Sequence, residues 1–420
     1  MSQPVAAQKA EKRVPGIDLL RGLCIVAVVL HHINLRIHFR DSSLGQLLGP
    51  AANRVLFWNG YYGVRMFFVI SGFLITTWSL KRWGSLSQLD RRQFYLMRFA
   101  RIVPCLAGLL VILSVLDRFG VPRFTINTQH TSLPRALLAA LTFHVNWLEA
   151  RTGYLPAAWD VLWSLSVEEV FYVFFPLLCT MLRKPALLIG LFSCFVIAGP
   201  FARVQTHNEL WADYGYLSCM DGIALGCLAA LLAAKVRFNP KVRFNQRSNP
   251  TLRISGTVLV LLITVFRGTA ARLALYKVGL DVTALQVGAA LLVIALQQSF
   301  EARATLDHSP LPSSSLRTRS GVTLGSLGSA LFRSTGVLLW FGRNSYEVYL
   351  THMLVVWPMV GLFFHFHQGV NTAVLWFLAI TALTGVAGHV LARSYSDPLN
   401  RRLRLGRWQG TPKSAAVAGD

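Results

Sequence analysis

The sequence predicts an all-α integral membrane protein, a polytopic helical bundle of about ten transmembrane helices. Of its 420 residues, 54% are hydrophobic and only 14% are charged, whereas soluble domains carry about 25% charged residues. Apolar runs of about 20 residues, the length that crosses a bilayer, recur along the whole chain. Clusters of Lys and Arg separate many of these runs. Together these observations favour a single membrane domain over several soluble ones.

The expected spans share an apolar character and differ mainly in length, with 102–118 and 252–266 the shortest for a full crossing. The ten runs lie at 17–35, 58–80, 102–118, 159–182, 185–203, 216–235, 252–266, 280–298, 336–365 and 372–392. Placing the basic loops in the cytoplasm puts both termini inside. A further run at 135–148 must then dip into the membrane or lie on its outer surface. As an eleventh span it would move the basic loop at 235–253 outside.

The membrane domain is expected to cover residues 1–408. Within it, the stretch 299–334 is rich in Ser, Arg and Gly, which predicts a flexible cytoplasmic loop. Residues 409–420 are expected to form a disordered tail, with no soluble domain after the bundle. The net charge of +23 fits loops that face anionic membrane lipids, with part of it available to an anionic ligand. In a membrane protein, this charge does not indicate nucleic-acid binding.

The six cysteines indicate packing rather than chemistry. All lie in apolar runs, without a CxxC pair or a histidine at metal-ligand spacing. We therefore expect no disulfide and no metal site.

The first expected span carries a polar stripe. Ionisable groups inside a membrane are expensive and commonly functional. Arg21 and His32 are 11 residues apart, so a helix places them within roughly 20° of one face and about 16 Å apart along its axis. Asp18 shares the Arg21 face, whereas His31 points about 80° away. The spacing therefore favours His32 over His31.

Arg98 and Arg101 lie three residues apart at a membrane boundary, so both guanidinium groups share one helix face. One interpretation is anchoring by positive charge on the cytoplasmic side. The other is a phosphate clamp, since arginine binds phosphate through paired hydrogen bonds.

Two adjacent carboxylates, Glu168 and Glu169, interrupt an apolar run near the expected outer end of their span. Unpaired, they would cost several kcal/mol. They either pair with an arginine of another span, for which Arg65 is a candidate, or they orient a catalytic histidine or the acceptor. Ser164, one turn before Glu168, and Ser166 are nearby hydroxyls.

Two further polar positions occur late in the chain. Asp221 is a lone acid in an apolar run, and His352 belongs to a polar segment of a late span. A lone histidine is more often a satisfied core residue than a catalyst. Close to Arg65, Ser71 and Gly72 are small residues of the kind found where helices pack tightly.

The residue types allow two classes of function. A buried histidine can deprotonate a hydroxyl for attack on an activated acyl group. A proton-coupled transporter would use the same buried histidines and carboxylates. Composition alone does not separate an acyltransferase from a transporter.

Five motifs in order resemble the membrane acyltransferase 3 family of O-acyltransferases. They are Arg21 followed by ten residues and His32, the run Gly63–Ile75, Arg98-Phe-Ala-Arg101, the run Trp163–Tyr172 and the late run Gly342–His352. Together they extend over almost the whole chain.

The resemblance implies transfer of an acyl group, commonly acetyl from acetyl-CoA, to a hydroxyl of a saccharide or cell-envelope glycan. It implies that His32 is catalytic with Arg21 as its partner, that Glu168 belongs to the site, and that Arg98 and Arg101 contact the acyl-CoA donor. No cofactor stays bound. Further candidates are Asp18, Ser166, Glu169, Asp221 and His352.

The expected partners are acyl-CoA, a saccharide or lipid-linked glycan acceptor and membrane lipids, in the cell inner (plasma) membrane as a multi-pass protein. A small metabolite such as a macrolide is an alternative acceptor. Without a soluble domain after the bundle, the chain would complete the transfer itself or rely on a separate partner.

This sequence departs from the family pattern at two positions. Many relatives carry an acid where this chain has Arg65, and many carry arginine where it has Cys219. Acceptor contacts or local pairing are therefore expected to differ at these positions, and no family role is assigned to them.

Overall fold

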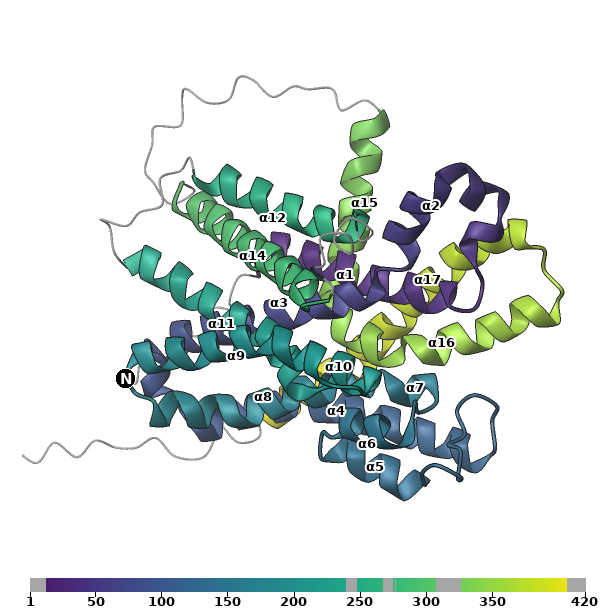
Figure 1. Cartoon of the computed structure of the whole chain (residues 1–420), viewed down its shortest axis with the longest axis horizontal. Coiled ribbons are helices and arrows are strands. Elements are labelled where there is room, and N and C mark those ends of the chain that lie inside the picture. The colour runs from purple at the N-terminus through teal and green to yellow at the C-terminus, as the bar shows by residue number, and fades with distance from the viewer. Residues whose placement is uncertain (1–12, 239–247, 267–274, 276, 307–325, 406–420) are drawn as a thin grey trace, which may run out of the picture.

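The computed structural model describes residues 13–238, 248–266, 275, 277–306 and 326–405. Throughout these residues the regular structure is helical, with no β-strand (Figure 1). The predicted all-α class is therefore confirmed. The predicted tail at 409–420 lies outside the described residues.

Nine helical segments of the described chain are long and apolar enough to cross a membrane, which supports a multi-pass protein. They are Pro15–Asn34, Ser43–Trp83, Arg91–Arg118, Ala157–Met181, Pro185–Gln205, Glu209–Lys235, Leu280–Glu301, Ser345–His365 and Val370–Arg404. The expected span at 252–266 forms helix α12 (Ser248–Val265), whose apolar part, Pro250–Val265, is shorter than a full span.

The apolar run at 336–365, expected to be one span, contains two helices. Helix α15 (Ser326–Arg343) and helix α16 (Ser345–His365) meet at Asn344. The Asn344 side chain donates to the Trp340 carbonyl oxygen over 2.8 Å. A short polar side chain that bonds to the local backbone competes with regular helix, and hydropathy does not detect it.

The apolar run at 102–118 is shorter than the helix that contains it. Helix α4 spans Arg91–Arg118, and the Asp90 side chain caps it by accepting from the Gln93 backbone N–H over 3.0 Å. The polar first turns lower the local hydropathy although the helix continues through them. Arg98 and Arg101 therefore lie two to three turns inside α4, deeper than the sequence indicated.

The run at 135–148 does not form a span. It folds into two short helices, α5 (Leu133–Leu141) and α6 (Val145–Thr152), each too short to cross a bilayer. With α7 (Ala157–Asp160) they gather at one edge of the molecule (Figure 1). This agrees with the expectation that the run does not cross.

Helices extend into both ends of the predicted loop at 299–334. Helix α14 (Leu280–Leu306) continues past residue 299, and α15 begins at Ser326. Residues 307–325 lie outside the described chain. The remaining α-helices of the described chain are α1 (Pro15–Asn34), α2 (Ser43–Phe57), α3 (Gly60–Trp83), α8 (Leu162–Met181), α9 (Pro185–Gln205), α10 (Glu209–Tyr214), α11 (Tyr216–Phe238), α17 (Ala373–Leu391) and α18 (Asp397–Leu405).

Glycine allows α3 and α11 to pack backbone to backbone. A Cβ atom on Gly72 would lie 2.0 Å from the Ile223 carbonyl oxygen, and one on Gly226 would lie 2.1 Å from the Val69 carbonyl oxygen. Small residues are needed where membrane helices approach this closely. The predicted role of Gly72 in tight packing is confirmed.

Gly72→Ala is expected to push α3 away from α11 and lower the stability of the bundle by about 1–3 kcal/mol, the usual effect of overpacking a tight contact. Thermal unfolding of the purified protein in detergent measures the loss. Gly190→Ala in α9 is the control, because nothing lies within 4 Å of a Cβ at that position. Equal melting temperatures for the two variants would contradict the assignment.

Candidate active site

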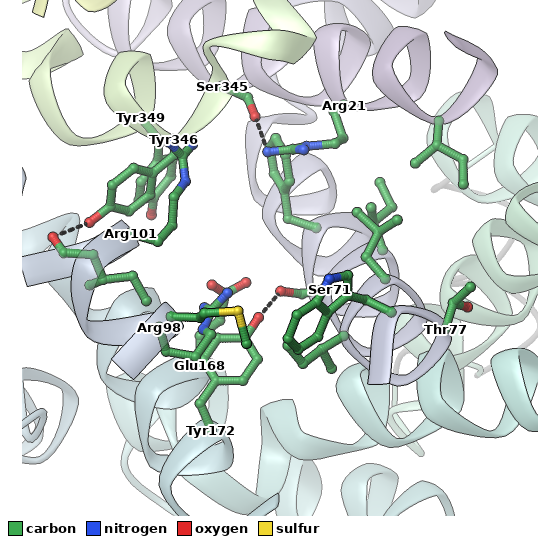
Figure 2. A pocket seen from close by; sticks show the side chains of 18 of the residues that line it. Arg21, Ser71, Thr77, Arg98, Arg101, Glu168, Tyr172, Ser345, Tyr346 and Tyr349 are labelled. Carbon is green, nitrogen blue, oxygen red and sulfur yellow. Dashed lines mark hydrogen bonds between the residues drawn. The ribbon is translucent and has the colours of Figure 1, made fainter. Parts of the chain in front are cut away.

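A cavity of about 670 Å³ opens among α1, α3, α4, α8 and α16. Figure 2 shows side chains from these separate helices pointing into one space. Six of the predicted site residues line it, and they come from three helices. These residues are Asp18, Arg21, Arg98, Arg101, Glu168 and Glu169.

The wall of the cavity carries an excess of positive charge. Eight basic side chains line it against four carboxylates, so the cavity suits a polyanionic ligand. The basic residues are Arg13, Arg21, Lys81, Arg82, Arg98, Arg101, Arg343 and Arg404. Exposed members of this set, such as Arg13, Arg343 and Arg404, place the mouth where α1 begins and α15 ends.

Arg98 is held in the wall by two contacts. Its guanidinium lies 3.3 Å from a Glu169 carboxylate oxygen, and its central carbon lies 3.5 Å from the centroid of the Tyr172 ring. An ion pair and a cation–π contact fix the side chain without removing all of its hydrogen-bond donors. Glu169 is thus the ion-pair partner of Arg98.

Arg101 forms a two-pronged ion pair with Glu347 of α16, at 2.9 Å and 3.4 Å between nitrogen and oxygen. Ser396 donates to the same carboxylate over 2.9 Å. Glu347 is buried and was not among the predicted candidates. The signal was present, since an acid in the apolar run before His352 needs a partner.

The sequence placed Arg98 and Arg101 at an inner mouth and Glu168 near an outer pocket. That separation is wrong, because all three line the same cavity. Depth was inferred from the position of each residue within its apolar run. Since α4 begins at Arg91 rather than at residue 102, its arginines reach the level of Glu168.

Glu168 differs from its neighbour Glu169, which pairs with Arg98. Among the described residues, no Lys or Arg forms an ion pair with it, and its carboxylate reaches into the cavity (Figure 2). Close by, the hydroxyls of Ser71 and Tyr172 form a hydrogen bond with each other. Glu168 is therefore a cavity carboxylate without an ion-pair partner among the described residues, and it can contact a ligand.

Arg21 contacts α16 at the cavity wall. Its guanidinium donates to the Ser345 hydroxyl over 2.7 Å. Asp18, one turn earlier, is buried, and one of its carboxylate oxygens has no hydrogen-bond partner in the described chain. Both polar groups thus keep bonding capacity for a ligand in the cavity.

His32 pairs with His352 of α16, with ring centroids 5.0 Å apart. His352 Nδ1 donates to the Tyr349 carbonyl oxygen over 2.6 Å. This leaves His352 Nε2, which is buried and has no partner in the described chain, as an acceptor. Arg21 and His32 both point toward α16, as their spacing predicts.

Neither histidine lines the cavity. Tyr349 and Ser164 line its wall instead, with their hydroxyls 2.7 Å apart, and His352 lies one turn beyond Tyr349. No hydrogen bond joins His32 to a carboxylate in the described residues. The expected orientation of His32 by a glutamate is therefore not seen, and His352 is its neighbour.

Arg65 does not pair with Glu168 or Glu169, so that expectation is wrong. It is fully buried and donates to the carbonyl oxygens of Ser218 and Asp213, at 2.9 Å and 2.7 Å, and to the Cys219 sulfur at 3.0 Å. Both departures from the family pattern, Arg65 and Cys219, thus meet in one contact. The expected difference in local pairing at these two positions is therefore seen as a direct contact between them.

Asp221 and Ser166 lie outside the cavity lining. Asp221 forms a buried ion pair with Arg203 at 2.7 Å and accepts from Gln286 at 3.1 Å. Ser166 accepts from the Val145 backbone N–H over 3.1 Å and joins α8 to α6. Both residues have structural contacts that account for their burial.

The model of an acyltransferase domain family, acyltransferase 3, matches residues 14–392. The chain belongs to this family. The peptidoglycan O-acetyltransferase OatA of Listeria monocytogenes is 27% identical over 366 residues, covering 83% of this chain and 50% of the relative. The O-acetyltransferase OatA of Staphylococcus aureus is 24% identical over 232 residues, covering 52% of this chain and 34% of the relative.

This acyltransferase 3 chain thus spans at most about half the length of these curated relatives. A putative O-acetyltransferase of Staphylococcus aureus is also similar, with 27% identity over 182 residues, 41% of this chain and 26% of the relative. No solved structure matches the chain.

Asp221→Asn is expected to lower the stability of the protein by about 3 kcal/mol, because it leaves the Arg203 guanidinium buried without its counter-charge. Thermal unfolding in detergent measures the change. Glu168→Gln is the matched control, since Glu168 has no ion pair to lose among the described residues. If Asp221→Asn melted with the wild-type protein, the ion pair would not be structural.

Proposed function

We propose that this protein is a membrane O-acyltransferase that moves an acyl group, commonly acetyl, from acyl-CoA to a hydroxyl of a saccharide. The observation that carries the proposal is the order of groups along two neighbouring helices. Arg21 meets Ser345 at the cavity, and His32 meets His352 further along both α1 and α16. A polyanion site and a basic group are thereby placed one after the other along the same two helices.

The cavity supports an acyl-CoA donor by charge and size. Its volume is within the range of about 300–1,000 Å³ found for small-molecule sites. Arginine binds phosphate oxygens strongly. Arg98 and Arg101 are each shared with a carboxylate, whereas Arg13, Arg343 and Arg404 extend the positive charge to the mouth. The mouth residues would hold the phosphates.

The separation between Arg21 and His32 fits a donor with a long flexible arm. Arg21 and His32 are about 16 Å apart along the helix axis. Tyr349 lines the cavity beside Ser164, and its carbonyl oxygen accepts from His352. An acyl thioester would thus reach the histidines while its phosphates stay at the basic mouth.

His32 would act as general base. An imidazole nitrogen takes the acceptor hydroxyl proton as the oxygen attacks the acyl carbon. A new C–O bond forms, the C–S bond breaks, and the sulfur leaves as thiolate, which takes a proton to give the thiol. His352 is held in one tautomer by the Tyr349 carbonyl and positions the His32 ring.

A saccharide acceptor is supported by the relatives, of which one is named a peptidoglycan O-acetyltransferase. In our proposal the basic cavity mouth faces the cytoplasm, where acyl-CoA is made, and the protein lies in the plasma membrane. The basic residues at that mouth agree with the positive-inside rule.

His32→Ala is expected to reduce transfer about 100-fold or more, the usual contribution of a general base. Membrane vesicles supplied with radiolabelled acetyl-CoA report label in the glycan fraction. His31→Ala is the matched control, because the His31 ring packs near Trp58 and faces the Phe57 carbonyl instead of His352. Full activity of His32→Ala, or proton-linked flux without any transfer, would overturn the proposal.

Replacing both Arg343 and Arg404 by Gln is expected to raise the KM for acetyl-CoA about 10-fold or more while kcat changes little, because phosphate contacts at the mouth are lost. Arg92→Gln serves as control, since Arg92 is an exposed arginine of α4 that does not line the cavity. Initial rates over a range of acetyl-CoA concentrations separate the two constants. An unchanged KM would place the donor elsewhere.

A further inference from the structure

A cluster of two arginines around one tryptophan lies beyond the histidine pair, away from the cavity. The guanidinium carbons of Arg36 and Arg123 each lie 4.5 Å from the centroid of the Trp357 ring. Arg36 follows His32 by four residues, about one helical turn, and Trp357 follows His352 by five residues on α16. We call these three residues the Arg–Trp–Arg cluster.

Three contacts join α1 and the residues just after it to α16, and they follow the same order along both segments. Arg21 meets Ser345, His32 meets His352, and Arg36 meets Trp357. The histidine pair thus lies between the basic cavity and the Arg–Trp–Arg cluster. If the donor reaches the histidines from the cavity, the acceptor can approach them from the opposite side, where the Arg–Trp–Arg cluster lies.

The arginines of the cluster, Arg36 and Arg123, carry positive charge without a carboxylate partner among the described residues. The Arg36 guanidinium donates to the Leu35 carbonyl oxygen at 3.2 Å. Partial burial and the nearby Arg123 lower the pKa of Arg36. Two like charges held together repel each other, and an anion between them relieves the repulsion.

Arg123 is presented by a strained backbone. Its φ is +72°, a left-handed conformation that a residue with a side chain seldom adopts. The flanking segment is fixed by the buried side chains of Phe124 and Ile126, and Trp159 donates to the Phe124 carbonyl oxygen over 3.3 Å. The surrounding structure therefore holds Arg123 against Trp357.

Trp357 has an unused donor in addition. Its indole N–H is buried and has no hydrogen-bond partner in the described chain. A buried donor without a partner costs free energy. An oxygen atom of a ligand bound to the two arginines would supply the missing acceptor.

We propose that the Arg–Trp–Arg cluster binds an anionic group, carboxylate or phosphate, of the saccharide acceptor and so selects acidic over neutral glycans. The inference rests on the proposed transferase function and adds the class of its acceptor. Arg36 and Arg123 contact the anion, and Trp357 aligns both guanidinium groups by cation–π contact and donates its indole N–H to the same anion.

Direct binding tests the proposal without turnover. The probes are three trisaccharides that differ only in the terminal group: a uronate, a sugar phosphate and the neutral sugar. They are titrated into the purified protein in a polyoxyethylene detergent without acetyl-CoA. The uronate or the phosphate probe is expected to bind about 10-fold tighter than the neutral one, the scale of one charged hydrogen bond. The charged probe that binds more tightly identifies the anion as carboxylate or phosphate.

Arg36→Gln and Arg123→Gln are each expected to weaken binding of the anionic probe about 10-fold and leave the neutral probe unchanged. Arg40→Gln is the matched control, because Arg40 is exposed one turn further on and lies 3.4 Å from Asp41. Trp357→Leu should lose the preference, whereas Trp357→Phe, which keeps an aromatic ring but lacks the indole N–H, should keep part of it. Thermal unfolding verifies that each variant is folded.

Equal binding of charged and neutral probes would overturn the inference. An equal loss of affinity in Arg36→Gln and Arg40→Gln would also overturn it. If the variants bound the probes normally but were no longer stabilised against unfolding by added phosphatidylglycerol, the cluster would be a lipid-headgroup site instead. Transfer without charge preference would refute the acceptor class alone. Charge-selective binding without any transfer would refute the proposed function and leave the site standing.

Discussion

The structure depends on pairing charges that an apolar bundle cannot bury alone. Arg98 with Glu169, Arg101 with Glu347 and Arg203 with Asp221 each join separate helices. An unpaired charge in such surroundings costs several kcal/mol. These pairs therefore help to fix how the helices sit against one another. They also leave a few groups, Glu168 among them, that the pairing does not use.

The site follows from this arrangement. The first two ion pairs lie in or beside the wall of the cavity, so the interactions that hold α4, α8 and α16 together also shape a basic chamber. Beyond that chamber, contacts between the α1 segment and α16 continue through the histidine pair to the Arg–Trp–Arg cluster. Donor, base and acceptor sites would then occupy successive positions on two helices.

Sequence reasoning succeeded where periodicity and composition decide. The helical class follows from long apolar runs, and the preference for His32 over His31 follows from 3.6 residues per turn. It failed where depth or partners decide. Hydropathy placed the start of α4 at residue 102, and so Glu168 and Arg98 were assigned to opposite sides. Arg65 was given the wrong partner because its neighbours, Tyr61 apart, come from residues about 150 positions away.

By itself, the sequence determined that this is a helical membrane protein with acyltransferase 3 motifs and a polar stripe on its first helix. Hydrophobicity sets the membrane helices and helical geometry sets the polar stripe, and neither requires long-range contacts. Only the tertiary structure decided that Glu169 pairs with Arg98, that Asp221 pairs with Arg203, and that His32 lies next to His352. Which charges pair depends on how helices distant in sequence pack, and no periodic pattern within one helix encodes that choice.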